Sequence, residues 1–168
     1  MLRFYTDGSS REHARKGGAA IVVLNDYDDI LIQWMRQYEN VTNNQMELQA
    51  ILHSLEIIEQ KHIKEECVIL SDSAYCINML NNWIYGWAIN GWRRFGDQPI
   101  LNLDLVKAIY EKIQWSRLPV TFEKVPGHKN VLGNELADRL ATNKLAEFIE
   151  ICEQYGIQPL KIENDLIF

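Results

Sequence analysis

The chain is short of the residues that build disulfide frameworks, zinc sites and membrane anchors. It has three cysteines in 168 residues, an odd number, and Cys67, Cys76 and Cys152 lie inside apolar runs. Buried reduced thiols are therefore expected. No apolar stretch reaches the roughly 18 residues that span a bilayer, and no basic and then apolar leader precedes the first expected strand. We expect a soluble, cytoplasmic protein with no membrane partner.

Positive charge is also scarce. The 17 Lys and Arg residues stand against 23 Asp and Glu residues, which gives a formal net charge of −6. Nonspecific affinity for nucleic acid comes mainly from Lys and Arg, so the net charge argues against an indiscriminate nucleic-acid binder. A protein whose carboxylates hold Mg²⁺ is not excluded, because the metal itself attracts phosphates. The length and the 47% apolar content suit one globular domain.

The apolar periodicity predicts an α/β fold. Alternation over residues 2–7 indicates a strand, and the turn residues Gly8, Ser9 and Ser10 are expected to end it. Further strands are expected over 18–24, 30–38, 67–70 and 120–125, and helices from 43 to about 60, around 75–80, over 101–115, and as one long helix from 131 to Gly156. Strands that follow a helical crossover usually lie parallel. This order therefore predicts a mixed five-stranded sheet, three antiparallel strands and then two parallel ones, flanked by helices.

Four acidic residues are placed where this fold brings ligands together. Asp7 and Asp72 follow expected strands, Glu47 lies in the first turn of a helix, and Asp138 lies near the start of the last helix. Ligands of open α/β sheets gather at the carboxyl ends of parallel strands. Singly, Asp7 or Asp138 could be a turn or cap residue. Together the four would repel one another without cations, so they indicate hard divalent metal ions.

Four motifs in this order and spacing resemble those of ribonuclease H of type 1, the endonuclease that cuts the RNA strand of RNA–DNA hybrids. They are Thr-Asp-Gly-Ser from Thr6, Thr-Asn-Asn-x-Met-Glu-Leu from Thr42, Ser-Asp-Ser from Ser71, and Gly-His…Asn-Glu-x-x-Asp from Gly127 to Asp138. The match covers roughly residues 2–145. It implies an RNase H-like catalytic domain over 1–155, followed by a tail over 156–168.

The resemblance also implies roles for single residues. Asp7, Glu47, Asp72 and Asp138 would bind metal, and His128 would be a catalytic residue that assists proton movement or product release. Two Mg²⁺ ions about 3.5–4 Å apart would clamp the scissile phosphate and leave 5′-phosphate and 3′-hydroxyl ends, with Mn²⁺ as a substitute. From chemistry alone, His128 could equally be a solvated loop residue.

The expected substrate is an RNA–DNA hybrid duplex, contacted in two places. Asn44 and Gln45 would reach the minor groove, where RNA displays its 2′-hydroxyls, although such residues also cap helices. The resemblance makes Thr42 and Asn102 a pocket for a DNA phosphate. The aromatic segment 83–95 resembles the family's basic protrusion, in which the expected contacts are Tyr75, Trp83, Trp87, Arg93 and Arg94. Core packing is the alternative for Trp83 and Trp92.

Some positions depart from the family pattern. Ala88, Ile89 and Asn90 stand where many relatives carry Lys or Arg, and Asn40 replaces an Arg that often precedes the Thr-Asn motif. These changes predict a lower affinity for the hybrid. The four carboxylates are unchanged, so catalysis is expected to be retained.

The sequence leaves alternatives for the role of the tail and for the function. The tail over 156–168 either docks on the domain or serves as a short peptide for a replication protein, and we expect a monomer. The alternative functions are another nuclease of this fold, such as a resolvase or exonuclease, and a noncatalytic hybrid-binding module.

Overall fold

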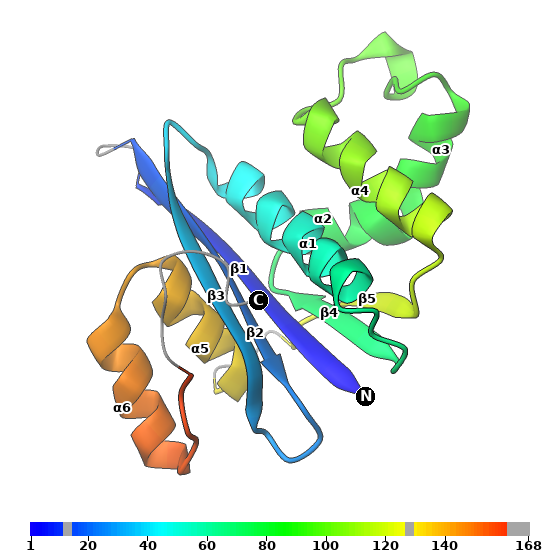
Figure 1. Cartoon of the computed structure of the whole chain (residues 1–168). Helices are drawn as coiled ribbons and strands as arrows, with labels where there is room; N and C mark the ends of the chain where they lie inside the picture. Colours follow the sequence, from blue (N-terminus) through cyan, green and yellow to red (C-terminus); the bar gives the residue numbers. More distant parts are fainter. Residues whose placement is uncertain (12–14, 127–129, 161–168) are drawn as a thin grey trace.

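Five strands form one mixed sheet in this computed structural model, which describes residues 1–11, 15–126 and 130–160 (Figure 1). The strands are β1 (Leu2–Arg11), β2 (Lys16–Leu24), β3 (Ile30–Glu39), β4 (Cys67–Ser71) and β5 (Val120–Lys124). Their order across the sheet is β3-β2-β1-β4-β5. The pairs β1–β2 and β2–β3 are antiparallel, whereas β1–β4 and β4–β5 are parallel. The predicted mixed sheet is thereby confirmed.

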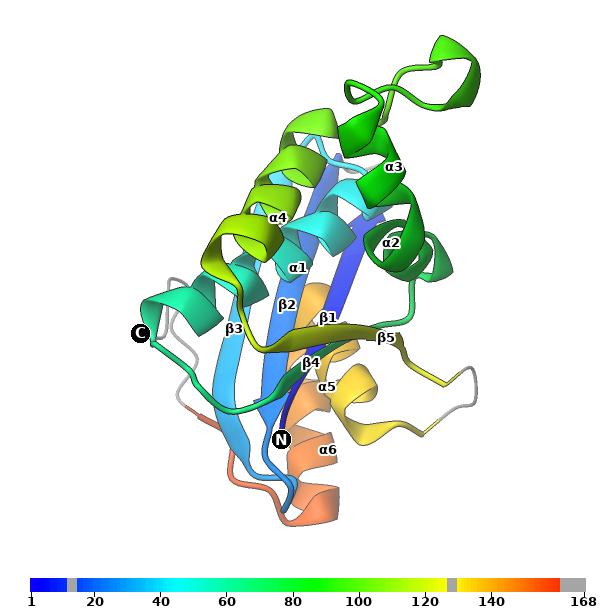
Figure 2. The same ribbon diagram turned by 90° about the vertical axis from the view of Figure 1, so that its right-hand side faces the viewer.

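Helices cover both faces of the sheet (Figures 1 and 2). On one face lie α1 (Asn43–Gln60), α4 (Leu103–Ser116) and the continuous run α2 (Ala74–Asn78), η2 (Met79–Trp83) and α3 (Ile84–Ile89); a short turn of helix, η3 (Phe95–Asp97), precedes α4. On the other face lie α5 (Leu132–Ala141) and α6 (Leu145–Tyr155). The alternation of β1 explains the two layers, because Phe4 joins the core under α1 and Tyr5 the core under α5.

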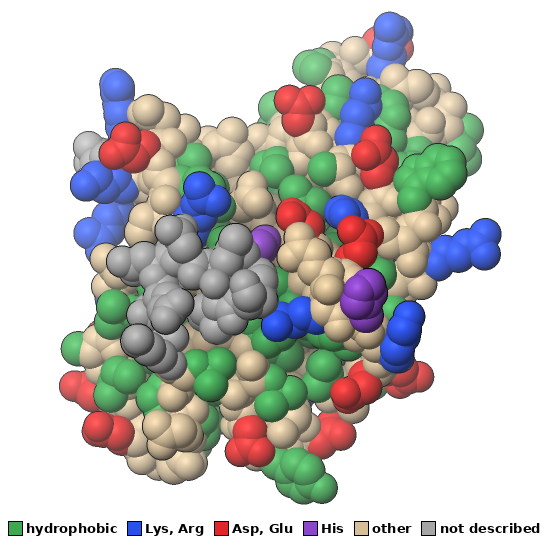
Figure 3. Space-filling view, in the orientation of Figure 1, with side chains coloured by type: hydrophobic (Ala, Val, Ile, Leu, Met, Phe, Trp, Pro, Cys, Tyr) green, Lys and Arg blue, Asp and Glu red, His purple; other side chains and the backbone are tan. Residues whose placement is uncertain are grey.

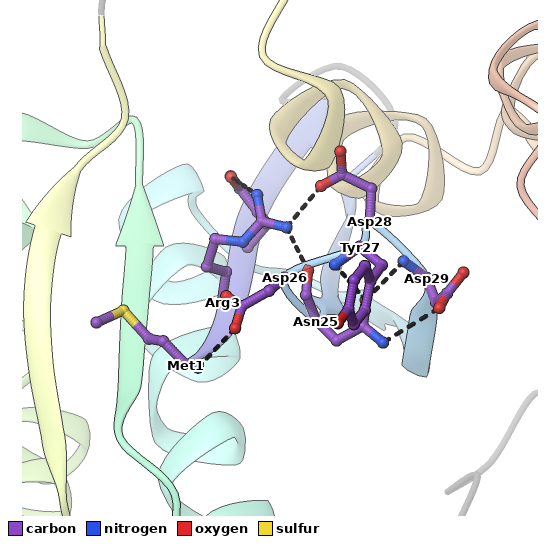
Figure 4. A network of polar contacts seen from close by, with 8 residues as sticks. Met1, Arg3, Asn25, Asp26, Tyr27, Asp28 and Asp29 are labelled. Carbon is purple, nitrogen blue, oxygen red and sulfur yellow. Dashed lines mark hydrogen bonds and ion pairs between the residues drawn. The ribbon is translucent and has the colours of Figure 1, made fainter.

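Polar side chains hold the turn between β2 and β3 (Figure 4). The side-chain oxygen of Asn25 accepts hydrogen bonds from the backbone N–H groups of Tyr27 and Asp29, each at 2.9 Å. Arg3 donates from β1 to the carbonyl of Asn25 and to the carboxylate of Asp28. This network fixes the antiparallel hairpin at the end of the sheet away from the candidate site.

The prediction that β1 ends in a turn at Gly8 is wrong. The strand continues to Arg11, because residues 3–11 pair with β2 without interruption. Only the parallel partner stops early, since the β1–β4 pairing ends at Tyr5 opposite Leu70. Asp7 is therefore not at a strand end. It lies where β4 leaves the sheet, so the sheet is open beside it and the carboxylate still reaches the β4 edge.

The single long helix predicted from residue 131 to Gly156 is also wrong. Residues 142–144 separate α5 from α6, with Asn143 in the left-handed region at φ 58°. The break turns α6 back so that Phe148 and Cys152 are buried in the core under α5. The apolar spacing could not reveal this, because it suits one helix or two. The predicted stop at Gly156 is confirmed, with φ 65° there.

The chain after α6 packs on the same face of the sheet. Ile157 and Leu160 contact the core under α5, and Leu160 exchanges two hydrogen bonds with the Gln33 side chain, at 3.2 and 3.3 Å. Residues 161–168 lie outside the described part, so the choice between a docked tail and a partner-binding peptide stays a prediction. The three cysteines are buried and free, as predicted. Among the described helices none is long and apolar enough to cross a bilayer.

Candidate active site

The first turn of α1 is fixed by a capping box. The Thr42 hydroxyl accepts from the backbone N–H of Gln45 at 3.2 Å, and the Gln45 side chain accepts from the backbone N–H of Thr42 at 2.8 Å. Met46 and Glu47 then face the sheet and are buried. The sequence pattern therefore sets the rotation of α1 that aims Glu47 at β1.

Close contact with β1 completes the placement of Glu47. Gly8 has no side chain, and this lets the α1 backbone approach; a Cβ added at Gly8 would lie 2.2 Å from the Glu47 backbone nitrogen. The Gly8 backbone also hydrogen-bonds the Glu47 carboxylate, and Ser71 donates its hydroxyl to Oε2 of Glu47 at 3.4 Å. Gly8 and Ser71 belong to motifs noted in the sequence, but their support of Glu47 was not predicted.

Three carboxylates converge at this point. Asp7, Glu47 and Asp72 each place an oxygen within 4.8 Å of the other two. Asp7 is 5% exposed and Glu47 is 7% exposed, whereas Asp72 faces solvent. Within the described residues, none of the three forms an ion pair with Lys or Arg. The described residues thus bring two buried acids and a third acid together, and the charge of Lys124 acts on the exposed one, Asp72.

Burial and mutual repulsion raise the pKa of these groups. The pKa of Asp7 lies well above its usual range because of burial first, and then because of the charges of Glu47, Asp72 and Asp138. The pKa of Glu47 is raised by burial and by Asp72, against the opposing hydrogen bonds from Gly8, Asp7 and Ser71. Burial and Asp138 raise the pKa of Asp72. The ionised cluster is unfavourable unless a cation joins it.

Asp138 stands near this cluster but is engaged elsewhere. Its charge acts on Asp7 and Asp72, yet its Oδ2 accepts a hydrogen bond from Arg139 at 2.7 Å. Arg139 in turn lies 3.6 Å from a carboxylate oxygen of Glu147 on α6. The structure thus groups three of the four predicted ligands tightly and pairs the fourth with a neighbouring cation.

The residues present fit a divalent metal site. The donors are oxygens from carboxylates, which Mg²⁺ and Mn²⁺ prefer, and among the described residues no cysteine or histidine joins the group. Two of the acids are buried, at a cost that a nearby cation would offset when both are ionised. Asp7, Glu47 and Asp72 would hold the metal, whereas Asp138, whose charge acts on Asp7 and Asp72, is paired with Arg139.

We expect Gly8→Ala to destabilise the fold and abolish the site. The new Cβ would meet the backbone of Met46 and Glu47 at 2.2–2.4 Å, so α1 must move away from β1. Overpacking of this kind costs about 3 kcal/mol, which urea unfolding would measure. Gly86→Ala is the matched control, because nothing lies within 4 Å of its added Cβ. If Gly8→Ala and Gly86→Ala have the same free energy of unfolding, the close approach of α1 to β1 does not position Glu47.

The remaining residues predicted near α1 line two cavities. Thr42 and Asn44 line a cavity of about 240 Å³ beside Ser10, whereas Asn102 and Gln45 line another of about 290 Å³ beside Asp104. The phosphate pocket shared by Thr42 and Asn102 therefore stays a prediction. His128 lies outside the described residues, and its role stays a prediction as well.

The protrusion carries a row of aromatic rings. Tyr75 and Trp83 have ring centroids 5.5 Å apart, and Trp83 and Trp87 are 6.2 Å apart. Trp83 is exposed rather than in the core, whereas Trp92 packs on Tyr110 at 5.2 Å. Core packing thus describes Trp92 but not Trp83.

The two arginines of the protrusion have different neighbours. The charge of Arg94 acts on the Tyr75 hydroxyl, which places Arg94 beside the aromatic row. Arg93 pairs instead with Asp97 at 3.7 Å, in an exposed contact that is easily exchanged. Arg94 is therefore the better placed of the two to meet a ligand that lies on the rings.

Comparison with known proteins agrees with this geometry. The RNase H family model matches residues 1–146. Ribonuclease H of Jannaschia sp. (strain CCS1) is 36% identical over 149 residues, which cover 86% of this chain and 90% of that protein. Among solved structures, LC9-RNase H1, a type 1 RNase H with the type 2 active-site motif, has a TM-score of 0.73 at 23% identity, over 96% of this chain and 88% of that one.

A foamy viral protease-reverse transcriptase in complex with an RNA/DNA hybrid is also similar. Its structure has a TM-score of 0.74 at 25% identity and covers 84% of this chain. The matching part is 19% of the viral chain, so the similarity concerns one domain of a larger protein. The sheet order, the acidic cluster and these matches lead to one conclusion: the chain belongs to the RNase H family.

Proposed function

We propose that this chain hydrolyses the RNA strand of RNA–DNA hybrids. The observation that carries the proposal is the convergence of Asp7, Glu47 and Asp72 within 4.8 Å, two of them buried and none paired with a basic residue in the described chain. Family membership supports the reaction class. The similar viral protein bound to an RNA/DNA hybrid supports the substrate class.

Two divalent cations, Mg²⁺ or Mn²⁺, would activate the attacking water and stabilise the leaving 3′ oxygen, leaving a 5′-phosphate. The chain itself holds and orients the carboxylates that would bind these cations. Asp7 and Glu47 are fixed by burial, and Ser71 and Gly8 aim the Glu47 carboxylate through hydrogen bonds. Asp138 would complete the ligand set after giving up its contact with Arg139, and His128 would assist proton movement or product release.

The hybrid would lie across the start of α1 and the protrusion. Asn44 is exposed at the first turn of α1, close in sequence to Glu47, and is placed to reach the 2′-hydroxyls of an RNA strand. Tyr75, Trp83 and Trp87 offer ring faces to the sugars of the DNA strand, with Arg94 beside them for a phosphate.

A substrate panel tests this proposal. Labelled RNA–DNA hybrid, duplex RNA and duplex DNA are incubated with the chain and Mg²⁺, and the products are sized and their ends identified. We expect internal cuts in the RNA of the hybrid alone, with 5′-phosphate ends. Equal cutting of all three duplexes would refute the substrate class, and a bound but uncut hybrid would indicate a binding module.

The protrusion should bind the hybrid weakly, and one added lysine should raise the affinity for the hybrid. Ile89 is 90% exposed on α3, so Ile89→Lys adds a cation without disturbing the core. If the protrusion meets phosphates, the dissociation constant should fall a few-fold and the log–log salt slope should steepen by ~0.9. Ala88→Lys beside it should add to the effect.

The matched control for this prediction is Tyr27→Lys. Tyr27 is 87% exposed but lies in the β2–β3 turn, away from the candidate site (Figure 4). Equal gains from Tyr27→Lys and Ile89→Lys, measured by fluorescence anisotropy, would show that only net charge matters and that the protrusion does not contact the substrate.

A further inference from the structure

A cavity of about 270 Å³ lies where the sheet extends beyond the end of α5. The C-terminal residues of α5 form one wall, and the ends of the three antiparallel strands form the rest. The lining residues are Ser9, Arg11, Lys16, Gly17, Gln37, Ala141, Thr142 and Asn143. A hydrogen bond joins β1 to the end of α5 at this cavity, because the Ser9 hydroxyl donates to the carbonyl of Ala141 at 3.1 Å. None of these residues belongs to the acidic cluster.

Two cations, Arg11 and Lys16, lie side by side in the lining of this cavity. Arg11 of β1 is directly opposite Lys16 of β2 in the strand register. Like charges in such a pair destabilise a sheet. Within the described residues neither side chain forms an ion pair. Figure 3 shows Lys and Arg side chains gathered at this end of β1 and β2. Glu39 is the cross-strand neighbour of Lys16 on its other side, so the two cations exceed the one acidic neighbour given by the strand register. In a chain with a net charge of −6, this local excess of positive charge favours an external anion.

The rest of the lining supplies neutral donors. Gln37 is paired in register with Gly18, and its amide nitrogen lies over that glycine, 2.7 Å from where a Cβ would be. In the described part of the chain, no hydrogen bond occupies the Gln37 side chain. The Asn143 amide adds a second neutral group at the exposed end of α5.

The carboxylate and carbonyl oxygens nearest the cavity are either outside its lining or already hydrogen-bonded. Glu39 is opposite Lys16 in the register but does not line the cavity. The carbonyl of Ala141, which would disfavour an anion, already accepts from Ser9. The cavity is therefore cationic and rich in donors, and these groups suit a phosphate oxygen.

The cavity lies on the same face of β1 as the Asp7 side chain. Side chains alternate along a strand, so Asp7, Ser9 and Arg11 point the same way. Four residues separate Asp7 from Arg11, which is about 13 Å at roughly 3.3 Å a residue. A nucleic-acid strand advances about 3.4 Å per nucleotide along the helix axis, so the separation matches about four nucleotides.

We propose that Arg11, Lys16 and Gln37 form a subsite for a backbone phosphate of the bound nucleic acid, about four nucleotides from the scissile bond. This assignment rests on the proposed function, because it needs a duplex held at the acidic cluster. It adds a contact on the side of the site away from the protrusion. The subsite would partly compensate for the few basic residues of the protrusion.

The test is hybrid binding by an Arg11→Gln/Lys16→Gln double variant. Anisotropy is measured against salt in an Asp72→Asn background, so that the hybrid is not consumed. We expect weaker binding and a log–log salt slope shallower by about 1.8, since each lost phosphate contact removes about 0.9. With Asp72 intact, KM should rise and kcat should stay the same. The melting temperature should not fall, because the variant removes a like-charge pair.

The charge-matched control is Lys64→Gln/Arg117→Gln. Both residues are exposed and lie before β4 and β5, at the opposite end of the parallel strands from Asp72. Its salt slope should equal that of the wild type. If the Arg11/Lys16 variant behaves like this control while the wild type still cuts the hybrid, the subsite is refuted and the proposed function stands.

Two further outcomes separate the remaining possibilities. If the wild type neither binds nor cuts the hybrid, both proposals fall. Inorganic phosphate, added at constant ionic strength, should leave the difference between variant and wild type intact. Loss of that difference would identify a site for free phosphate ions and overturn the nucleic-acid assignment.

Discussion

Asp72→Asn should lower kcat for hybrid cleavage on the order of 10³-fold or more, with the fold intact. A metal site supplies several kcal/mol of transition-state stabilisation, and each 1.4 kcal/mol is about tenfold in rate. The carboxamide keeps the size of Asp72 but removes a charge and a metal-binding oxygen. Asp72 is exposed, and the neighbouring Ser73 caps α2, so the substitution leaves the packing unchanged. Steady-state kinetics with saturating hybrid measure kcat, and circular dichroism shows whether the fold is intact.

Asp26→Asn provides the control for this experiment. The Asp26 side chain is 71% exposed and pairs with the N-terminus at 3.3 Å, at the end of the sheet away from the cluster. It should cut the hybrid at the wild-type rate. If Asp72→Asn retains a rate within about tenfold of the wild type, a difference of only some 1.4 kcal/mol, Asp72 is not a metal ligand in the reaction.

The metal-free chain should lose stability as the pH rises, and Mg²⁺ should restore it. The raised pKa values of Asp7 and Glu47 mean that the folded state keeps protons that the unfolded chain releases from about pH 4 upward. The free energy of unfolding therefore falls with rising pH until both folded-state pKa values are passed. We expect a loss of about 2 kcal/mol or more between pH 5 and pH 8 in chelator, since one pKa unit is about 1.4 kcal/mol.

Asp7→Asn should reduce this pH dependence. The buried amide needs no proton to stay neutral, so the unfolding free energy in chelator at pH 8 should rise by about 2 kcal/mol, and Mg²⁺ should no longer stabilise the chain. Urea unfolding at both pH values, with chelator or with Mg²⁺, gives these numbers. The control is Asp104→Asn, an exposed acid outside the cluster that should keep the wild-type pH and metal dependence. A wild type equally stable at both pH values without metal would contradict the buried-cluster account.

The sheet could be predicted because its signals are local. Alternation over residues 2–7 and the unbroken apolar run at 67–70 give the strand type directly, and the helical crossover gives the parallel pairing. The meeting of Asp7, Glu47 and Asp72 followed from this topology. The end of β1 did not, because Gly8 to Ser10 read as a turn, and only their pairing with β2 keeps them extended.

The features that sequence reasoning missed depend on contacts between distant segments. That Gly8 permits the approach of α1, and that Ser71 donates to Glu47, follow from packing alone. The pairing of Asp138 with Arg139 was not predicted, since adjacent residues on a helix do not usually face each other. The cavity beyond α5 also depends on where that helix ends, which periodicity left open.

Binding of divalent metal by the acidic cluster is tested most directly by anomalous diffraction from a Mn²⁺-soaked crystal of the chain with a bound hybrid. We expect manganese peaks between the carboxylates of Asp7, Glu47 and Asp72, with Asp138 turned from Arg139 toward them. A cluster without manganese beside a well-ordered hybrid would contradict this expectation.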